Sequence, residues 1–209
     1  MFLYVKLAIP FQIPIFPYDY ARRGNTCLHL TFPPKFSIPE TPFLDTASTI
    51  GAMHLLPLTE ADRTYLARLN FLADTFGGEH KALPDGFEEG FDYYLGGWEP
   101  SRGGFIAWEG HVPAGGVWLN WGTAERHGFG HVAEGIPELA LAVESRFRGQ
   151  GVGTVLIDAA TDLAREMNTP GISLSAAKDN DRAHRLYLHL GFEPVSERDG
   201  HIVLVKRFS

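Results

Sequence analysis

The residues with the clearest chemical potential form a glycine-rich turn, residues 148–153, with the sequence RGQGVG. Glycine lets the backbone approach a ligand closely, and the start of a following helix presents unpaired amides and the positive end of its dipole. Such a turn is typical of a phosphate site, with Arg146 or Arg148 as the nearby cation. Taken alone, the motif is also compatible with a turn that only packs a strand against a helix.

Two common nucleotide-binding motifs do not fit this turn. A nucleoside-triphosphate loop needs a lysine after its last glycine, and the turn contains none. A dinucleotide fold needs Gly-x-Gly-x-x-Gly and an acidic residue about 20 positions later. The glycine spacing differs here, and the next apolar run, residues 172–176, ends without an acid. The phosphate ligand must therefore be of another class.

The turn belongs to a longer ordered pattern. It follows Leu-x-Val at 141–143 and precedes Ser-Leu-Ser at 173–175 and an Asn…Tyr…Leu-Gly-Phe stretch at 180–192. The combined pattern resembles the acetyl-CoA-binding half of the GNAT superfamily of N-acetyltransferases. The resemblance covers residues 138–192 closely and residues 53–206 in the order of elements, and it does not extend to residues 1–50.

The resemblance implies how acetyl-CoA binds. The pyrophosphate would lie on the amides of the turn, and the pantetheine arm would pair with strand 138–143, which separates from strand 172–176 to receive it. Asn180 would contact the pantetheine side. The cofactor-binding residues expected in this way are Leu141, Ala142, Val143, Arg146, Arg148, Gly149, Gln150, Gly151, Val152, Gly153, Thr154, Ser175 and Asn180.

Two residues are candidates for catalysis. An alkyl amine is almost entirely protonated at pH 7, so acetyl transfer to it needs a base. Residues 138–143 alternate with period two, which places Glu138 on one face with Ala140 and Ala142 and leaves room for an acceptor. Glu138 is the candidate base; a solvated residue at a strand start is the alternative. The resemblance implies that Tyr187 faces the thioester sulfur as proton donor, although its apolar helix stripe also suits an ordinary core residue.

Other polar groups carry weaker signals. His127 and His131 are four residues apart, but the glycines between them disfavour a helical metal pair, and no metal site is expected. Glu88, Glu89 and Asp92 lie in an aromatic-rich segment that would border the acceptor side. They either attract a cationic amine or form a solvated helix face.

The elements around these residues predict an α/β (α+β) fold. We expect a GNAT-type mixed, largely antiparallel sheet of six to seven strands flanked by helices. A capping signature at 59–62 opens the first helix, and a short helix lies within 77–104. The expected strands are 53–58, 105–108, 116–121, 138–143, 172–176 and 201–206, and the later helices are 154–167 and 181–190.

The first part of the chain has a different composition. Residues 1–50 contain 7 of the 14 prolines. Pro10, Pro14 and Pro17 break any apolar helix, so we expect neither a signal peptide nor a membrane span. Residues 1–51 are interpreted as an extended Pro-rich N-terminal arm, packed on the domain 52–209 or on a second subunit of a homodimer. The alternative is that they lie outside the folded unit, with Met53 as a natural start.

Charge and cysteine content narrow the function classes. The chain has 18 Lys+Arg and 25 Asp+Glu, a net charge of −7, which disfavours a nucleic-acid groove. The single cysteine, Cys27, forms no internal disulfide, so a cytoplasmic protein is expected. It also lies outside the motif region and offers no nucleophile there.

These observations lead to one expected function and two alternatives. The protein is expected to move an acetyl group from acetyl-CoA directly to a primary amine of a small molecule, peptide or protein, releasing CoA. One alternative is a non-catalytic GNAT-fold sensor of acyl-CoA. The other is a GNAT-type toxin acting on aminoacylated RNA, which the acidic balance disfavours.

Overall fold

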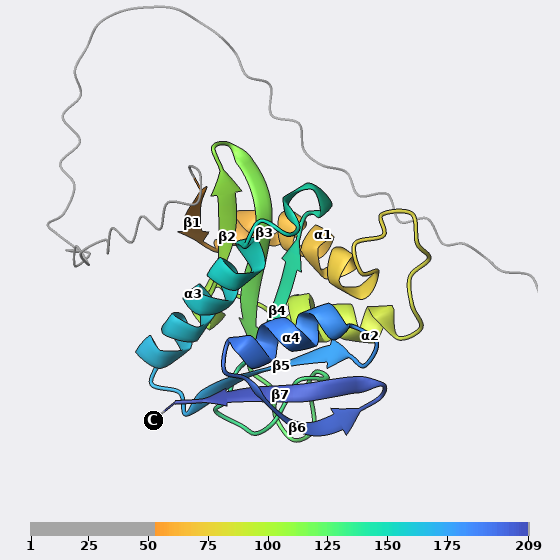
Figure 1. The fold of residues 1–209 in the computed structure, drawn as a ribbon, viewed down its shortest axis with the longest axis vertical. Coiled ribbons are helices and arrows are strands. Elements are labelled where there is room, and N and C mark those ends of the chain that lie inside the picture. Colours follow the sequence, from red (N-terminus) through yellow and green to blue (C-terminus); the bar gives the residue numbers. More distant parts are fainter. Residues whose placement is uncertain (1–52, 209) are drawn as a thin grey trace, which may run out of the picture. The chain divides into compact units, whose positions relative to one another are not determined.

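A computed structural model describes residues 53–208 (Figure 1). The predicted Pro-rich arm and Cys27 lie outside the described residues. Within residues 53–208, no helix combines the length and apolar character that crossing a bilayer requires. The strands are β1 (Met53–Pro57), β2 (Gly104–Glu109), β3 (Val112–Asn120), β4 (Glu138–Val143), β5 (Gly171–Ala177), β6 (Glu193–Arg198) and β7 (His201–Arg207). The α-helices are α1 (Arg63–Asp74), α2 (Phe87–Phe91), α3 (Val152–Glu166) and α4 (Asp181–His189).

The seven strands form one sheet in the order β1-β2-β3-β4-β5-β7-β6. All neighbours are antiparallel except β4 and β5, so the predicted mixed, largely antiparallel sheet is confirmed. The parallel pair meets at a single position, Glu138 opposite Ser173, where the Ser173 amide donates to the Pro137 carbonyl at 2.9 Å. Beyond that position the two strands diverge, and the sheet opens between them.

The period-two pattern of β4 separates two packing layers. Its larger residues, Leu139, Leu141 and Val143, pack with α3 and α4. Its small residues, Ala140 and Ala142, pack with α1 on the other face. The helices therefore cover both faces of the sheet (Figure 1). The predicted alternation is confirmed, and it places Glu138 on the face covered by α1.

Local signals fix several element ends. Thr59 and Asp62 form the predicted capping box before α1. Asn180 caps α4, because its side chain accepts a hydrogen bond from the Ala183 amide at 3.2 Å. Gly191, with φ of +83°, follows α4 in a backbone conformation that other residues rarely adopt.

The structure differs from the expected elements in three places. Strand β6 was not expected, because its side chains are almost all exposed and Pro194 interrupts its pattern. Helix α3 begins two residues earlier than expected, directly after Gly151. The second hairpin strand, β3, already begins at Val112, so the connection from β2 is shorter than the sequence suggested.

Candidate functional site

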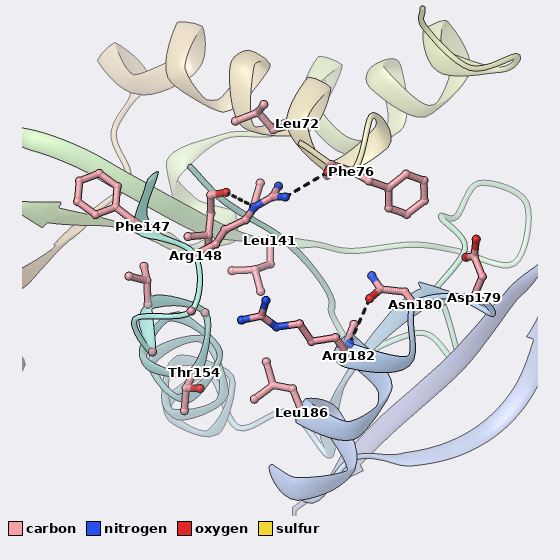
Figure 2. Close-up of a pocket in the computed structure, with 18 of the residues that line it drawn as sticks. Leu72, Phe76, Leu141, Phe147, Arg148, Thr154, Asp179, Asn180, Arg182 and Leu186 are labelled. Atoms are coloured by element: carbon pink, nitrogen blue, oxygen red, sulfur yellow. Dashed lines mark hydrogen bonds between the residues drawn. The ribbon is translucent and has the colours of Figure 1, made fainter. Parts of the chain in front are cut away.

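A first cavity, of about 700 Å³, lies between the end of β4, the glycine-rich turn and the start of α4 (Figure 2). We call it the turn cavity. The structure brings ten of the predicted cofactor residues to its wall: Leu141, Ala142, Val143, Arg148, Gly149, Gly151, Val152, Gly153, Thr154 and Asn180. Segments that are distant in the sequence therefore meet at one site.

The backbone of the turn explains two of its glycines. Gly149 and Gly151 have φ values of +78° and +82°, in the left-handed region that favours glycine. The Val155 amide donates to the Gly151 carbonyl at 3.2 Å, so the amides of residues 152–154 precede the first intrahelical bond. Gly153 is already helical, and a β-carbon there would make an ordinary 3.9 Å contact with Val143. The turn thus presents helix N-terminal amides to the cavity, an arrangement suited to an anion.

Arg182 is a cation of this cavity that sequence reasoning missed. It extends from the first turn of α4 toward the glycine-rich turn (Figure 2), and its Nη2 lies 3.5 Å from the place where a β-carbon of Gly149 would be. The signal that could have indicated it is its position two residues after the capping Asn180. The site therefore has a cation that is held by α4 and lies beside the glycine-rich turn.

The two cations predicted at the turn, Arg148 and Arg146, differ in their relation to the cavity. Arg148 spans the cavity wall: its Nε donates to the Val143 carbonyl at 3.3 Å and its Nη1 to the Phe76 carbonyl at 3.2 Å. The Arg146 guanidinium lies 4.8 Å above the Phe147 ring, and the Gln150 side chain donates to the Arg146 carbonyl at 2.9 Å. Neither Arg146 nor Gln150 lines the turn cavity, and their part in binding stays a prediction.

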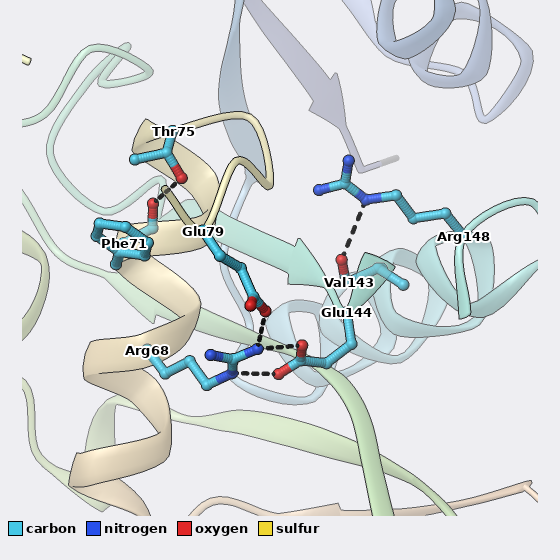
Figure 3. Close-up of polar contacts among 7 residues, drawn as sticks. All are labelled: Arg68, Phe71, Thr75, Glu79, Val143, Glu144 and Arg148. Atoms are coloured by element: carbon cyan, nitrogen blue, oxygen red, sulfur yellow. Dashed lines mark hydrogen bonds and ion pairs between the residues drawn. The ribbon is translucent and has the colours of Figure 1, made fainter. Parts of the chain in front are cut away.

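An ion-pair group braces this region (Figure 3). The Arg68 guanidinium of α1 donates to both oxygens of Glu144, at 2.7 and 2.8 Å, and to Glu79 at 2.6 Å. Glu144 follows β4 directly and is buried, whereas Glu79 lies in the loop after α1. The group therefore ties α1, this loop and the end of β4 together.

A second cavity, of about 490 Å³, lies where β4 and β5 diverge, and we call it the splay cavity. Glu138, Ser175 and Tyr187 all line it, so the two predicted catalytic residues share one space. Leu141 and Asn180 line both cavities, which therefore adjoin.

Glu138 is buried, with 2% of its surface exposed, so the alternative of a solvated residue is wrong. Its Oε1 accepts hydrogen bonds from the Tyr94 hydroxyl and the Gly130 amide, both at 2.7 Å. Its Oε2 has no hydrogen-bond partner among the described residues. Burial raises the pKa of this carboxyl, and the two hydrogen bonds to Oε1 oppose the rise. The group therefore has the environment of a base with increased proton affinity.

Tyr187 packs in the apolar layer and also forms part of the wall of the splay cavity. Its ring packs against Phe192, with the ring centres 6.0 Å apart. Burial raises the pKa of its hydroxyl to about 12. The phenol is therefore protonated at neutral pH, and its role as a proton donor stays a prediction.

The weaker candidates lie elsewhere. Glu88, Glu89 and Asp92 are exposed and line a surface hollow apart from both cavities, and Asp92 pairs with Arg126 there. Whether they attract a cationic amine or only form a solvated face stays a prediction. The rings of His127 and His131 stack with their centres 4.9 Å apart. Within residues 53–208, no three His, Cys, Asp or Glu side chains gather as a metal site would require.

Solved structures of low sequence identity share this fold. The PaiA N-acetyltransferase of Thermoplasma acidophilum, solved in complex with coenzyme A, is 13% identical, with a TM-score of 0.56 over 75% of this chain and 99% of that one. The ribosomal-protein-S18-alanine N-acetyltransferase of Escherichia coli is 18% identical, with a TM-score of 0.54 over 75% and 94%. A GNAT-family acetyltransferase of Staphylococcus aureus Mu50 is 15% identical, with a TM-score of 0.55 over 76% and 100%.

Sequence comparison gives the family directly. No curated protein matches the chain significantly. The model of the acetyltransferase (GNAT) family matches residues 70–192, which run from the last turn of α1 to the residue before β6 and include the turn cavity and Glu138. The chain belongs to the GNAT family of acetyltransferases.

Proposed function

We propose that residues 52–209 transfer an acetyl group from acetyl-CoA directly to a primary amine. The observation that carries this proposal is that Glu138 and Tyr187 line one cavity, which adjoins the glycine-rich turn. Membership of the GNAT family supports acyl transfer from CoA. That the acceptor is a primary amine is our proposal.

The turn cavity would hold the phosphate end of the donor. The amides at the start of α3 would face an anion, and the Arg182 guanidinium reaches the same turn from α4. A helix end contributes only about 0.3–1 kcal/mol toward a surface charge, so several charge-assisted hydrogen bonds must act together. The pantetheine arm would then follow β4 into the opening between β4 and β5, where Leu141, Ser175 and Asn180 lie.

The splay cavity would hold the reacting amine. Only about one alkyl amine in 2,500 is neutral at pH 7, given a pKa of about 10.4. Glu138 accepts a proton from the ammonium, and acetyl-CoA, when bound, supplies the thioester carbonyl that the neutral amine attacks. As the carbon–sulfur bond breaks, Tyr187 donates its proton to the leaving sulfur. The amine nitrogen gains the acetyl group, its second proton restores the Tyr187 phenol, and Glu138 releases the first proton to solvent.

Two measurements on the purified full-length protein test the proposal. CoA and acetyl-CoA should raise the Tm, because a ligand that binds only the folded state stabilises it. Acetyl-CoA with a panel of primary amines should release free thiol only when an amine is present. A Tm shift without thiol release for any amine would support the non-catalytic sensor, and no Tm shift at millimolar CoA would contradict the donor site.

A further inference from the structure

The charged side chains that line the splay cavity are mostly acidic. Carboxylates reach it from four separate segments: Asp74 at the end of α1, Asp85 in the following loop, Glu138 on β4 and Asp199 between β6 and β7. No Lys or Arg is among its described lining residues, and His201 is the one basic side chain there.

The charged side chains that line the adjoining turn cavity are mostly basic. Lys81, Arg148 and Arg182 line it, against the single carboxylate of Asp179. The two ends of the site therefore differ in charge: cations gather where the donor's phosphates would bind, and carboxylates gather where the acceptor would bind.

Two of the acidic side chains are buried or partly buried and form no ion pair among the described residues, although Arg198 and His127 lie near enough to Glu138, and His201 to Asp74, to lower the carboxyl pKa. Glu138 is 2% exposed, and its Oε2 accepts no hydrogen bond from a described residue. Asp74 is partly buried and accepts one hydrogen bond, from Asn70 Nδ2 at 2.9 Å. Neither carboxylate takes part in an ion pair with any residue of 53–208. A buried carboxylate normally requires a paired cation, and here a ligand can supply it.

Burial also affects the protonation of Asp74. It raises the pKa of this carboxyl to about 6, and the Asn70 hydrogen bond and the nearby His201 oppose the rise. Asp85 and Asp199, in contrast, are exposed. The cavity thus has two inner carboxylates, on α1 and on β4, and two outer ones.

The remaining wall is suited to a short hydrocarbon chain. Phe87, Tyr94 and Phe129 line the cavity together with Leu139 and Leu141. Aromatic faces also attract ammonium groups.

We propose that the splay cavity selects an amine carrying a second cationic group, joined to the reacting amine by a short aliphatic chain. This inference rests on the proposed acetyl transfer. The reacting ammonium lies at Glu138, which takes its proton, while the second ammonium keeps its charge and pairs with Asp74. The exposed Asp85 and Asp199 attract the dication toward the cavity. A small diamine is therefore a better acceptor than a monoamine of the same length.

The test compares acceptors that differ only in the second charge. With the full-length protein and saturating acetyl-CoA, thiol release is measured for 1,5-diaminopentane, pentylamine and 5-amino-1-pentanol, and diamines of other lengths locate the best spacing. We expect kcat/KM for the diamine to exceed that for either monoamine by about tenfold or more, as a partly buried ion pair would give. The increase should appear mainly as a lower KM.

A matched pair of variants locates the effect. Asp74→Asn keeps the size of the side chain and an acceptor for Asn70, and it should reduce the diamine-to-monoamine ratio toward one. Asp158→Asn removes an exposed carboxylate of α3 outside the cavity and should keep the ratio. The CoA-dependent Tm shift of each variant reports whether the fold and donor site are intact, and Asp74→Ser provides a second substitution.

Each outcome decides between the two proposals. Equal kcat/KM for diamine and monoamine, or a ratio unchanged in Asp74→Asn, would overturn the dication inference and leave acetyl transfer standing. If no amine is acetylated although CoA raises the Tm, the proposed transfer fails. In that case calorimetric titration of the CoA-bound protein with diamine and monoamine still decides whether the cavity selects a dication, because it requires no turnover.

Discussion

Arg68 and Glu144 form a two-point ion pair between α1 and the residue that follows β4, with Nε to Oε1 at 2.7 Å and Nη2 to Oε2 at 2.8 Å (Figure 3). Glu144 is buried, whereas the Arg68 side chain remains 43% exposed. The pair holds the end of β4 in position shortly before the glycine-rich turn, so it connects the stability of the fold to the geometry of the turn cavity.

Removing the cation of this pair should destabilise the protein. Arg68→Ala leaves the Glu144 carboxylate buried without its partner, and we expect a loss of about 1–3 kcal/mol, below the range for fully buried pairs because Arg68 is partly solvated. Urea unfolding measures the change. Lys178→Ala removes an exposed pair with Glu197 and should cost less than about 1 kcal/mol. Equal losses in both variants would contradict the bracing role of Arg68.

Glu138→Gln should remove the base and change the pH profile. At neutral pH the rate should fall by about 10²–10⁴-fold, the usual contribution of general-base catalysis. The difference in rate between the variant and the wild type should shrink as the pH approaches the pKa of the amine, because the neutral amine then becomes abundant. Burial raises the pKa of Glu138, so the wild-type rate should fall below that raised value as the carboxylate takes up a proton. A deficit of the same size at every pH would show that Glu138 is not the base.

The same substitution should stabilise the fold at neutral pH. A carboxyl whose pKa is raised by folding contributes stability below its unfolded pKa of about 4.3, and this contribution is lost as the pH rises through the folded value. The neutral amide of the Glu138→Gln variant has no charge to desolvate, and its oxygen can still accept from Tyr94 and Gly130. The Tm of the variant should therefore exceed that of the wild type at pH 7, by about 2–4 °C per kcal/mol, and the difference should vanish toward pH 4.

Arg182 should contribute to donor affinity through its charge. Arg182→Gln should weaken CoA binding by about tenfold, and the difference should decrease with added salt, because the lost interaction is electrostatic. Arg185→Gln removes an equally exposed arginine of α4 that does not line the turn cavity, and its affinity should stay near that of the wild type. Isothermal titration with CoA at two salt concentrations measures both variants, and equal affinities would exclude a role for Arg182.

Tyr187→Phe should have a modest effect on the rate. The leaving thiolate has an ordinary pKa of about 8.5 and departs readily, so a proton donor adds little, and we expect a loss of about tenfold or less. The ring contact with Phe192 is kept in the variant, so its Tm should be close to that of the wild type. A loss of a thousandfold would instead show that this phenol is essential to a slow chemical step.

Regular patterns made much of this site predictable. The period-two alternation of residues 138–143 placed Glu138 on the correct face of the sheet, because a strand has no other way to orient alternate side chains. The glycine-rich turn was visible because it needs particular residue types at fixed spacing. Each of these features depends only on residues that are close together in the sequence, so it can be predicted from the sequence alone.

Contacts between distant, irregular segments were not predictable. Tyr94 lies 44 residues from Glu138, and Gly130 comes from a loop without periodicity, yet both determine the hydrogen bonding of the carboxylate. Strand β6 carries exposed side chains at the sheet edge, where burial imposes no hydrophobic pattern. In each case the position depends on tertiary packing, which leaves little trace in neighbouring residues.

Because β4 and β5 are joined by a single residue pair, a ligand bound in the opening between them would add contacts that hold the sheet together. If CoA occupies the opening, it connects two parts of the sheet whose strand pairing is otherwise limited to Glu138 and Ser173. A ligand that binds the folded state alone adds about 2.7 kcal/mol when its concentration is 100 times Kd. The lifetime of the protein against proteases would then follow the supply of CoA, so that depletion of the donor would reduce the amount of protein as well as its rate of turnover.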